Sequence, residues 1–153
     1  MDRPAETRER FPHLFELATR WADNDVYGHV NNATYYSWFD TAVNRFLIDR
    51  GVLDLAGSKV FGVVVETGCR YMKSVSFPDV VDVGVRVARM GTSSVRYELA
   101  IFRRGDPDAA ATGNFVHVYV DRDSRKPVPI PQAVREALAP LVVGRENDPA
   151  PER

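Results

Sequence analysis

The sequence predicts a single α+β domain in which one long helix packs on a sheet of antiparallel strands. The first observation is a helical spacing of apolar residues in the segment 32–50. The second is an alternation of apolar and polar residues that begins near residue 60 and continues, with interruptions, to residue 120. One helix followed by a run of strands is typical of domains in which the helix covers one face of the sheet.

A first strand is predicted at residues 13–21, ahead of the helix. Its apolar side would consist of Phe15, Leu17, Thr19 and Trp21. Residues 22–32 follow with the sequence ADNDVYGHVNN, which is rich in Asp, Asn and Gly. These residue types form turns and helix caps, so we expect a loop that leads into the helix.

The central helix is expected to run from about residue 32 to residue 50. Its buried face recurs at helical intervals and consists of Tyr35, Trp38, Phe39, Ala42 and Phe46. Asn31 or Asn32 can cap the start, because an Asn side chain accepts hydrogen bonds from free backbone N–H groups. Gly51 suits the left-handed position that commonly follows the last turn.

Four further strands and a short closing helix complete the predicted order. The strands are expected at 60–71, 81–88, 95–101 and 115–120, and the helix at 132–142. The edges of so small a sheet are exposed unless something pairs with them. We therefore expect self-association.

Length and composition narrow the possible classes of protein. The 153 residues fit one domain, 1–153, with a core from about residue 12 to residue 142 and flexible termini. A formal net charge of -1 provides no overall basic field for nucleic acid, and the single cysteine excludes a disulfide within the chain. The start of the sequence is polar, and no apolar run approaches the roughly 20 residues that span a bilayer. We expect a cytoplasmic protein with no membrane partner.

The loop before the helix contains the residues best suited to chemistry. Asp23 and Asp25 lie beside the helix start, where free N–H groups and a partial positive charge can bind an anion or a carbonyl oxygen that is becoming one. Gly28 would let the backbone approach a ligand closely. A carboxylate beside such a helix end supplies two parts needed for acyl transfer. Asp and Asn in front of a helix also commonly serve only as caps and turns.

Residues 23–35, with the sequence DNDVYGHVNNATY, resemble the signature of hot-dog acyl-CoA thioesterases of the 4-hydroxybenzoyl-CoA thioesterase type. The resemblance is to the bacterial branch that carries GHVNN, and it extends over about residues 12–142. It implies the hot-dog fold, with a five-stranded antiparallel sheet wrapped around one long central helix. It also implies homodimers or homotetramers with active sites at subunit interfaces, and an acyl-CoA substrate. No metal and no cofactor is implied, since coenzyme A is part of the substrate.

The resemblance also implies roles for particular residues. Asp25 corresponds to the catalytic carboxylate, as either nucleophile or general base, and the backbone N–H near Asn32 would polarise the thioester carbonyl. Some family members have His at position 32 and Tyr at position 21, so acid–base help from Asn32 is not implied. Substrate contacts are expected from Gly28, His29, Asn31, Tyr35, Lys73, Arg89 and Arg96. The last three would bind coenzyme A phosphates, with Arg122, Arg125 and Lys126 as further candidates.

Several alternatives stay open at this point. Asp23 and His29 are expected mainly to shape the loop, Asp40 to form hydrogen bonds on the helix, and His117 to be a hydrogen-bonded strand histidine. A non-catalytic module that binds acyl-CoA or an acyl carrier protein is an alternative function on the same fold. A hot-dog dehydratase is a third, although its Asp/His pattern is not visible. The acyl group and the choice between dimer and tetramer cannot be read from the sequence.

Overall fold

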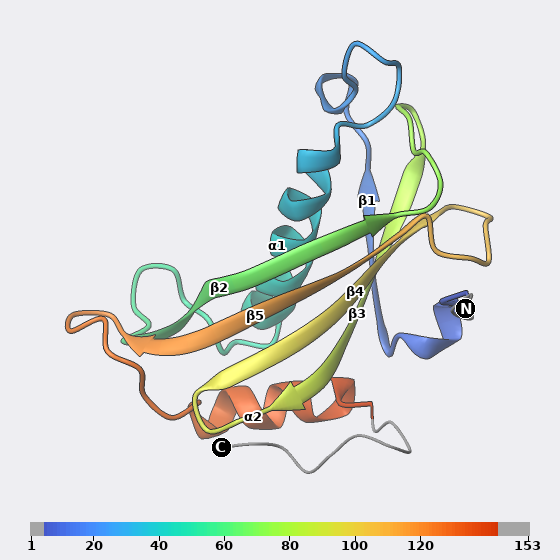
Figure 1. Ribbon diagram of the computed structural model, residues 1–153. Coiled ribbons are helices and arrows are strands. Elements are labelled where there is room, and N and C mark those ends of the chain that lie inside the picture. Colours follow the sequence, from blue (N-terminus) through green and yellow to red (C-terminus); the bar gives the residue numbers. More distant parts are fainter. Residues whose placement is uncertain (1–4, 144–153) are drawn as a thin grey trace.

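The computed structural model describes residues 5–143, so residues 1–4 and 144–153 of the predicted flexible termini lie outside the described part. Five strands form one antiparallel sheet in the order β1-β3-β4-β5-β2, and a long helix packs on it (Figure 1). The main elements are β1 (His13–Ala18), α1 (Asn32–Asp49), β2 (Val60–Tyr71), β3 (Val80–Met90), β4 (Ser94–Arg103), β5 (Ala111–Asp121) and α2 (Gln132–Leu138). Three 3-10 turns are η1 (Arg8–Arg10), η2 (Trp21–Asp23) and η3 (Ala139–Leu141). The predicted fold class and order of elements are confirmed.

Helix α1 begins and ends where its local sequence signals predict. The Asn31 side chain accepts a hydrogen bond from the Ala33 N–H at 2.9 Å, and Gly51 has a φ of 73° directly after the last turn. The buried face consists of Tyr35, Trp38, Phe39, Ala42, Val43, Phe46 and Leu47. No helix within residues 5–143 combines the length and apolar character needed to cross a membrane.

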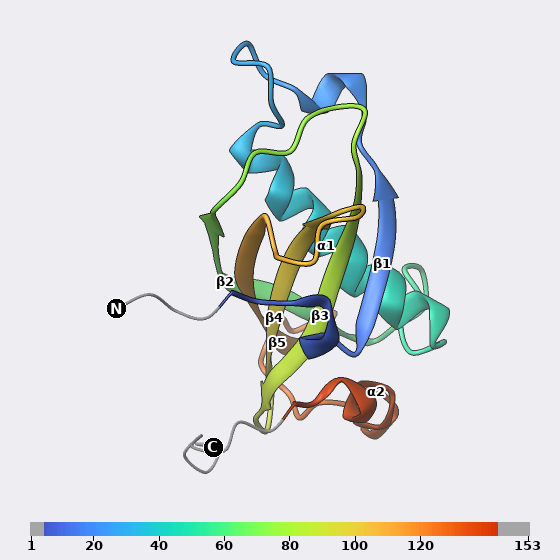
Figure 2. The ribbon, with the colours of Figure 1, turned by 90° about the vertical axis from the view of Figure 1, so that its right-hand side faces the viewer.

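The core lies between α1 and the sheet, and alternate residues of the central strands supply it. Valines 81, 83, 85 and 87 of β3 are fully buried, as are Val95, Tyr97 and Ile101 of β4. Figure 2 shows α1 along one face of the sheet, with β1 and β2 on either side. Phe39 lies directly against Gly113 of β5, where a Cβ atom would be 2.4 Å from the ring. Glycine is therefore required at this contact.

The first strand is shorter than its alternating pattern predicts. β1 ends at Ala18, and Trp21 instead opens η2 with 79% of its surface exposed. The Asp23 carboxylate accepts a hydrogen bond from the Arg20 backbone N–H at 2.7 Å. This local bond closes a turn that a continued strand would not allow.

The last strand and the closing helix also differ from expectation at their ends. β5 begins at Ala111 rather than at Phe115, because it pairs with β2 as far as Tyr71. The predicted helix at 132–142 is divided into α2 and η3. Pro140 lies at the start of η3 and has no N–H to continue the α-helical ladder.

Residues 5–11, at the start of the chain that the sequence predicts to be flexible, cross the sheet face opposite α1 (Figure 2). The reason is a buried cation in the sheet. Arg86 is 6% exposed, pairs with Glu6 at 2.9 Å and lies over the Phe11 ring at 4.4 Å. Phe11 packs edge-on against Phe102, with ring centroids 5.8 Å apart. Charge pairing and apolar contact together hold this segment on the sheet.

His117 differs from the expected hydrogen-bonded strand histidine. It lies on β5 and is 2% exposed, and its buried Nδ1 has no hydrogen-bond partner within residues 5–143. Its Nδ1 faces Gly62 of β2, where a Cβ atom would be 2.7 Å away. Burial lowers the pKa of His117 to about 4.

The buried imidazole should make the fold sensitive to mild acid. A histidine of the unfolded chain titrates near pH 6.5, whereas folded His117 has a pKa of about 4, so the unfolded state binds more protons between these values. The stabilising contribution is complete above pH 6.5 and is lost as the pH falls to 4. We expect this loss to be about 3 kcal/mol of unfolding free energy, measured by urea unfolding at each pH. His117→Phe should remove this part of the pH dependence, and an unchanged dependence in the variant would contradict the assignment.

Candidate active site

The loop between β1 and α1 is held in shape by Asp23, which is 1% exposed. Its carboxylate accepts hydrogen bonds from the Arg20 backbone and guanidinium at 2.7 and 2.8 Å. Its backbone carbonyl accepts a hydrogen bond from the Asn31 N–H at 2.9 Å. Asp23 thus ties the start of the loop to its end, in agreement with the loop-shaping role expected from the sequence.

Asp25 lies in a tight turn that presents its carboxylate to the surface. The Asp25 N–H donates to the His29 carbonyl at 3.0 Å, and the Asp25 carbonyl accepts from the Gly28 N–H at 3.2 Å. Gly28 has a φ of 88°, which favours glycine. The carboxylate accepts a hydrogen bond from the Tyr27 N–H at 2.9 Å through Oδ1, whereas Oδ2 has no hydrogen bond or ion pair within the described residues. One oxygen orients the group, and the other is available to a ligand.

The first turn of α1 leaves one backbone donor without an acceptor. The Asn31 side chain binds the Ala33 N–H, and the Asn31 carbonyl binds the Thr34 N–H at 2.9 Å. The N–H of Asn32 has no acceptor within residues 5–143. Asn31 therefore caps the helix, and position 32 offers a free amide at the positive end of the helix dipole.

Asp25 and Asn32 line one cavity of about 390 Å³ at the start of α1. The loop and helix supply one wall, and residues 71–74, at the end of β2 and directly after it, supply the other. The lining residues are Asp25, Tyr27, His29, Val30, Asn32, Tyr35, Tyr71, Met72, Lys73 and Ser74. Five of the residues predicted for the site are thus brought together: Asp25, His29, Asn32, Tyr35 and Lys73.

Tyr71 is a cavity residue that sequence reasoning did not select. Its hydroxyl donates to the Asn32 carbonyl at 2.8 Å, and its ring meets Tyr35 edge-on at 5.0 Å. Burial, with help from neighbouring groups, raises its pKa above the ordinary value, so the hydroxyl stays protonated. The only available signal was its place at the end of β2, and that place gains meaning only when the strand meets α1.

The rest of the second wall is attached to the sheet rather than to the loop. The Met72 and Lys73 N–H groups both donate to the Ala110 carbonyl, at 2.8 and 3.0 Å. Tyr71 is the residue of the segment 71–74 that hydrogen-bonds to α1. Met72 and Lys73 are thus held by the sheet, whereas Tyr71 joins this wall to the start of α1.

The basic residues are only partly brought to the cavity. Lys73 lines it and pairs with Asp106 at 3.0 Å. Arg96 pairs with Glu66 at 3.2 Å, and Arg89 lies opposite Arg96 on the neighbouring strand, so neither contributes to the lining. The further candidates follow the end of β5, toward the other end of α1: Arg122, Arg125 and Lys126.

Two rival nucleophiles or bases lie outside this cavity. Asp40 is exposed on α1 and accepts a hydrogen bond from the Asn44 side chain at 3.1 Å. Cys69 lies on β2, and burial raises the pKa of its thiol, which disfavours the reactive thiolate. Both observations favour Asp25 over these groups.

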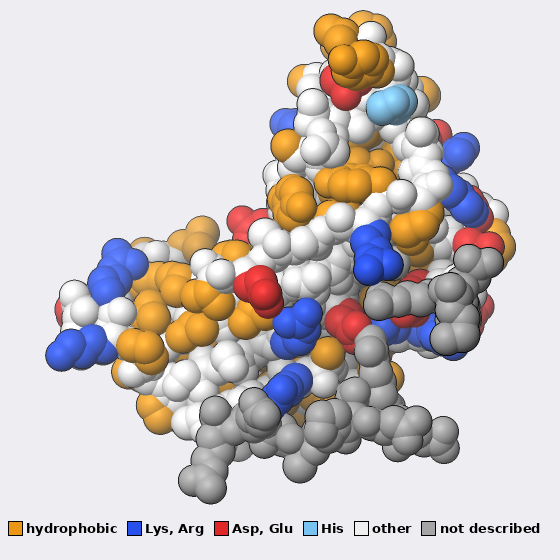
Figure 3. Space-filling model, in the orientation of Figure 1, with side chains coloured by type: hydrophobic (Ala, Val, Ile, Leu, Met, Phe, Trp, Pro, Cys, Tyr) orange, Lys and Arg blue, Asp and Glu red, His pale blue; other side chains and the backbone are white. Residues whose placement is uncertain are grey.

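The tip of the loop is apolar and uncovered. Trp21, Val26 and Tyr27 are 79%, 94% and 81% exposed, and hydrophobic side chains are visible at the top of the molecule in Figure 3. His29 is also exposed, and its ring stacks on Tyr27 with centroids 6.5 Å apart. The mouth of the cavity therefore presents aromatic surface that a ligand or a protein partner can cover.

Removing the helix cap should destabilise the site locally. Asn31→Ala deletes the acceptor for the Ala33 N–H, and we expect unfolding free energy to fall by about 1 kcal/mol in urea unfolding. Asn31→Asp keeps a side-chain oxygen at this position and should stay close to wild type. Equal stability of Asn31→Ala and wild type would show that the cap contributes nothing.

Comparison with known proteins identifies the family. The sequence model of the thioesterase-like superfamily matches residues 19–138 of this chain. The chain is 55% identical to the PA5185 protein from Pseudomonas aeruginosa strain PAO1, with a TM-score of 0.89 over 91% of this chain and 97% of that one. It is 31% identical to the PA2801 protein, a proposed thioesterase from Pseudomonas aeruginosa, with a TM-score of 0.78 over 83% and 98% of the two chains. It is 25% identical to the BH1999 gentisyl-coenzyme A thioesterase, with a TM-score of 0.73 over 82% and 99%. The chain therefore belongs to the thioesterase-like superfamily and has the hot-dog fold of these relatives.

Proposed function

We propose that this protein hydrolyses acyl-coenzyme A thioesters to a free carboxylic acid and coenzyme A. The observation that carries the proposal is one shared cavity lined by both Asp25, whose Oδ2 has no partner, and Asn32, whose backbone N–H has no acceptor within the described residues. Membership of a thioesterase superfamily supports thioester hydrolysis as the reaction class.

The free amide of Asn32 is proposed to bind the thioester carbonyl oxygen. As the carbonyl carbon becomes tetrahedral, negative charge develops on that oxygen, and the donor at the positive end of α1 stabilises it. The hydroxyl of Tyr71 binds the adjacent Asn32 carbonyl and so fixes the position of the first helical turn. Tyr71 is therefore a positioning residue in this scheme.

Asp25 is proposed to act on the carbonyl carbon in one of two ways. As nucleophile, its oxygen forms a bond to that carbon, the carbon–sulfur bond breaks, and water then hydrolyses the mixed anhydride. As general base, it takes a proton from water while the water oxygen bonds to the carbon, and the departing thiolate is protonated afterwards. Both routes consume one water and give the same acid and thiol.

Coenzyme A is the proposed carrier of the acyl group. A relative at 25% identity is a gentisyl-coenzyme A thioesterase, which supports this choice. Lys73 at the cavity wall is positioned to exchange its ion pair with Asp106 for a phosphate of the carrier. Arg89 and Arg96 would become phosphate contacts if the carrier extends from the cavity across the sheet.

A homo-oligomer is proposed as the working form. β2 is an edge strand, and its Val64 and Val65 are 45% and 59% exposed. An exposed apolar edge of this kind supports pairing with a second copy. Light scattering on the purified chain measures whether it is a monomer, a dimer or a tetramer.

The decisive experiment follows free thiol release from a panel of acyl-CoAs that differ in chain length and aromatic character, with the same acyl groups on an acyl carrier protein. Time-dependent thiol release with matching acid formation supports the hydrolase. Tight binding without turnover across the whole panel would instead support the non-catalytic binding module. Loss or gain of water with the thioester intact would indicate a dehydratase.

A further inference from the structure

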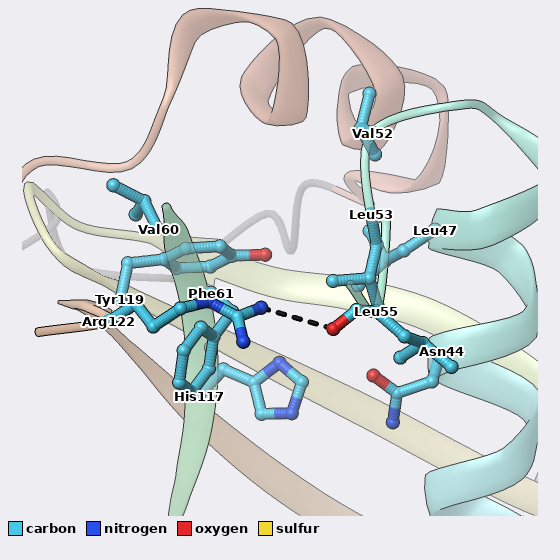
Figure 4. A pocket seen from close by; sticks show the side chains of 11 residues that line it. Asn44, Leu47, Val52, Leu53, Leu55, Val60, Phe61, His117, Tyr119 and Arg122 are labelled. Atoms are coloured by element: carbon cyan, nitrogen blue, oxygen red, sulfur yellow. Dashed lines mark hydrogen bonds between the residues drawn. The ribbon is translucent and has the colours of Figure 1, made fainter. Parts of the chain in front are cut away.

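A second cavity of about 270 Å³ lies at the other end of α1 and has no part in the proposed hydrolysis (Figure 4). It is enclosed by the second half of α1, the chain leading to β2, and strands β2 and β5. Apolar side chains form most of its wall, among them Leu47, Leu53 and Val60. Asn44 at this cavity follows Asn32 by twelve residues, so helical rise separates the two sites by about 18 Å along α1.

The wall contains one buried polar ring without a partner. His117 is 2% exposed and its buried Nδ1 has no hydrogen-bond partner, and no hydrogen bond to Nε2 is found within the described part of the chain. Figure 4 shows the ring extending from β5 toward Asn44 on α1. Because Nδ1 is enclosed beside Gly62, Nε2 is the ring atom left for a ligand. Buried polar groups are nearly always bonded, so an unpartnered one in a cavity wall indicates a missing partner.

Asn44 supplies a complementary acceptor across the cavity. Its side-chain NH₂ donates to the Asp40 carbonyl at 2.8 Å and to the Asp40 carboxylate at 3.1 Å. The side-chain carbonyl oxygen of Asn44 has no donor within residues 5–143. The cavity therefore offers an acceptor on α1 and a neutral imidazole on β5.

The charges around the cavity disfavour an ionic ligand. The Arg122 guanidinium is bonded to the segment between α1 and β2 that closes the cavity. It donates to the Ser58 and Leu55 carbonyls at 2.6 and 3.2 Å. Its positive charge disfavours a cation in the cavity. The neutral ring of His117 and the negative end of the α1 dipole disfavour an anion.

We propose that this cavity binds an apolar molecule that carries a single hydroxyl group. The hydroxyl donates to the Asn44 side-chain oxygen and accepts a hydrogen bond from His117 Nε2, which gives each of these two atoms a partner. The apolar body packs against the leucine and valine wall. This site is independent of Asp25, and the inference goes beyond the proposed thioester hydrolysis.

Three matched probes test the chemistry: 4-ethylphenol, ethylbenzene without the hydroxyl, and 4-ethylbenzoate with a charge in its place. Binding is measured by calorimetry and by the NMR signals of the His117 ring. The phenol should bind at least about tenfold more tightly than either analogue and should shift the His117 signals. Equal affinity for 4-ethylphenol and ethylbenzene, or no binding of the phenol at millimolar concentration, would overturn the proposal.

Variants locate the binding event. Asn44→Leu should weaken 4-ethylphenol binding about tenfold and leave ethylbenzene binding unchanged. Leu53→Trp, in the chain between α1 and β2, fills the cavity and should abolish binding, whereas Ile48→Trp, at an exposed position near the end of α1, should not. Asp25→Asn should bind 4-ethylphenol as wild type does, so failure of the hydrolase proposal would leave this result intact. Binding retained by Leu53→Trp would place the probe elsewhere and refute the site.

Discussion

Asp25→Asn is expected to lower kcat/KM for acyl-CoA hydrolysis by a factor of about 10² to 10⁴. The amide cannot attack the thioester carbon, and it cannot take a proton from water at neutral pH. Its side-chain oxygen can still accept the hydrogen bond from the Tyr27 N–H, so the turn around position 25 should keep its shape. The loss should therefore appear in turnover and not in folding.

Asp40→Asn is the matched control for the Asp25 substitution. It makes the same chemical change in a carboxylate that is exposed on α1 and does not line the first cavity. Its kcat/KM should stay within about twofold of wild type. Unfolding curves of both variants establish that they are folded. A folded Asp25→Asn protein that hydrolyses at the wild-type rate would exclude Asp25 as the reacting group.

Phe39→Ala is expected to lower the free energy of unfolding by about 3 to 5 kcal/mol. Phe39 is fully buried at the centre of the contact between α1 and the sheet, and its ring covers Gly113. Truncation removes the buried ring and leaves a cavity, because β5 has no side chain at Gly113 that could fill it. Helix and sheet would then lose the contact between the Phe39 ring and Gly113.

Urea unfolding of Phe39→Ala and of a surface control measures this effect. Ile48→Ala alters a residue of the same helix that is 40% exposed, and it should cost less than about 1 kcal/mol. A loss below 1 kcal/mol for Phe39→Ala would mean that the helix–sheet contact does not depend on the aromatic ring. Far-UV circular dichroism before denaturation checks that both variants start from the native fold.

The helix could be predicted from the sequence because its signals are local. Asn31 and Gly51 mark its two ends, and apolar residues at helical spacing mark its buried face. The end of β1 could not be predicted in the same way. The apolar alternation continues to Trp21, but the bond from Arg20 to Asp23 closes a turn first. A single side-chain bond to the backbone thus overrides a pattern of apolar residues.

The N-terminal segment shows a second reason why the sequence does not reveal where a segment lies in the fold. Residues 5–11 are mainly charged, and charge alone predicts exposure. Arg86, eighty positions after Glu6, is buried in the sheet, and its ion pair with the Glu6 carboxylate holds the N-terminal segment against the sheet. Nothing near residue 6 in the sequence shows that this partner exists.

In the candidate site, too, the features set by local sequence could be predicted, and those set by distant contacts could not. Asp25 and Asn32 are seven residues apart, so their shared cavity follows from local structure. Tyr71 reaches the cavity only because β2 ends beside α1, and that proximity is a property of the whole sheet. Arg89 and Arg96 point elsewhere because strand register, which the sequence does not reveal, decides their direction.

The two walls of the first cavity come from separate parts of the sequence. One wall is a short continuous stretch that contains Asp25 and Asn32, and the other, at Met72 and Lys73, is bonded to Ala110 of the sheet. Substitutions in the second wall can reshape the chamber while the turn around Asp25 stays intact. Under the proposed function, different side chains at positions 72 and 73 would change the space for the acyl group and leave the proposed catalytic groups in place.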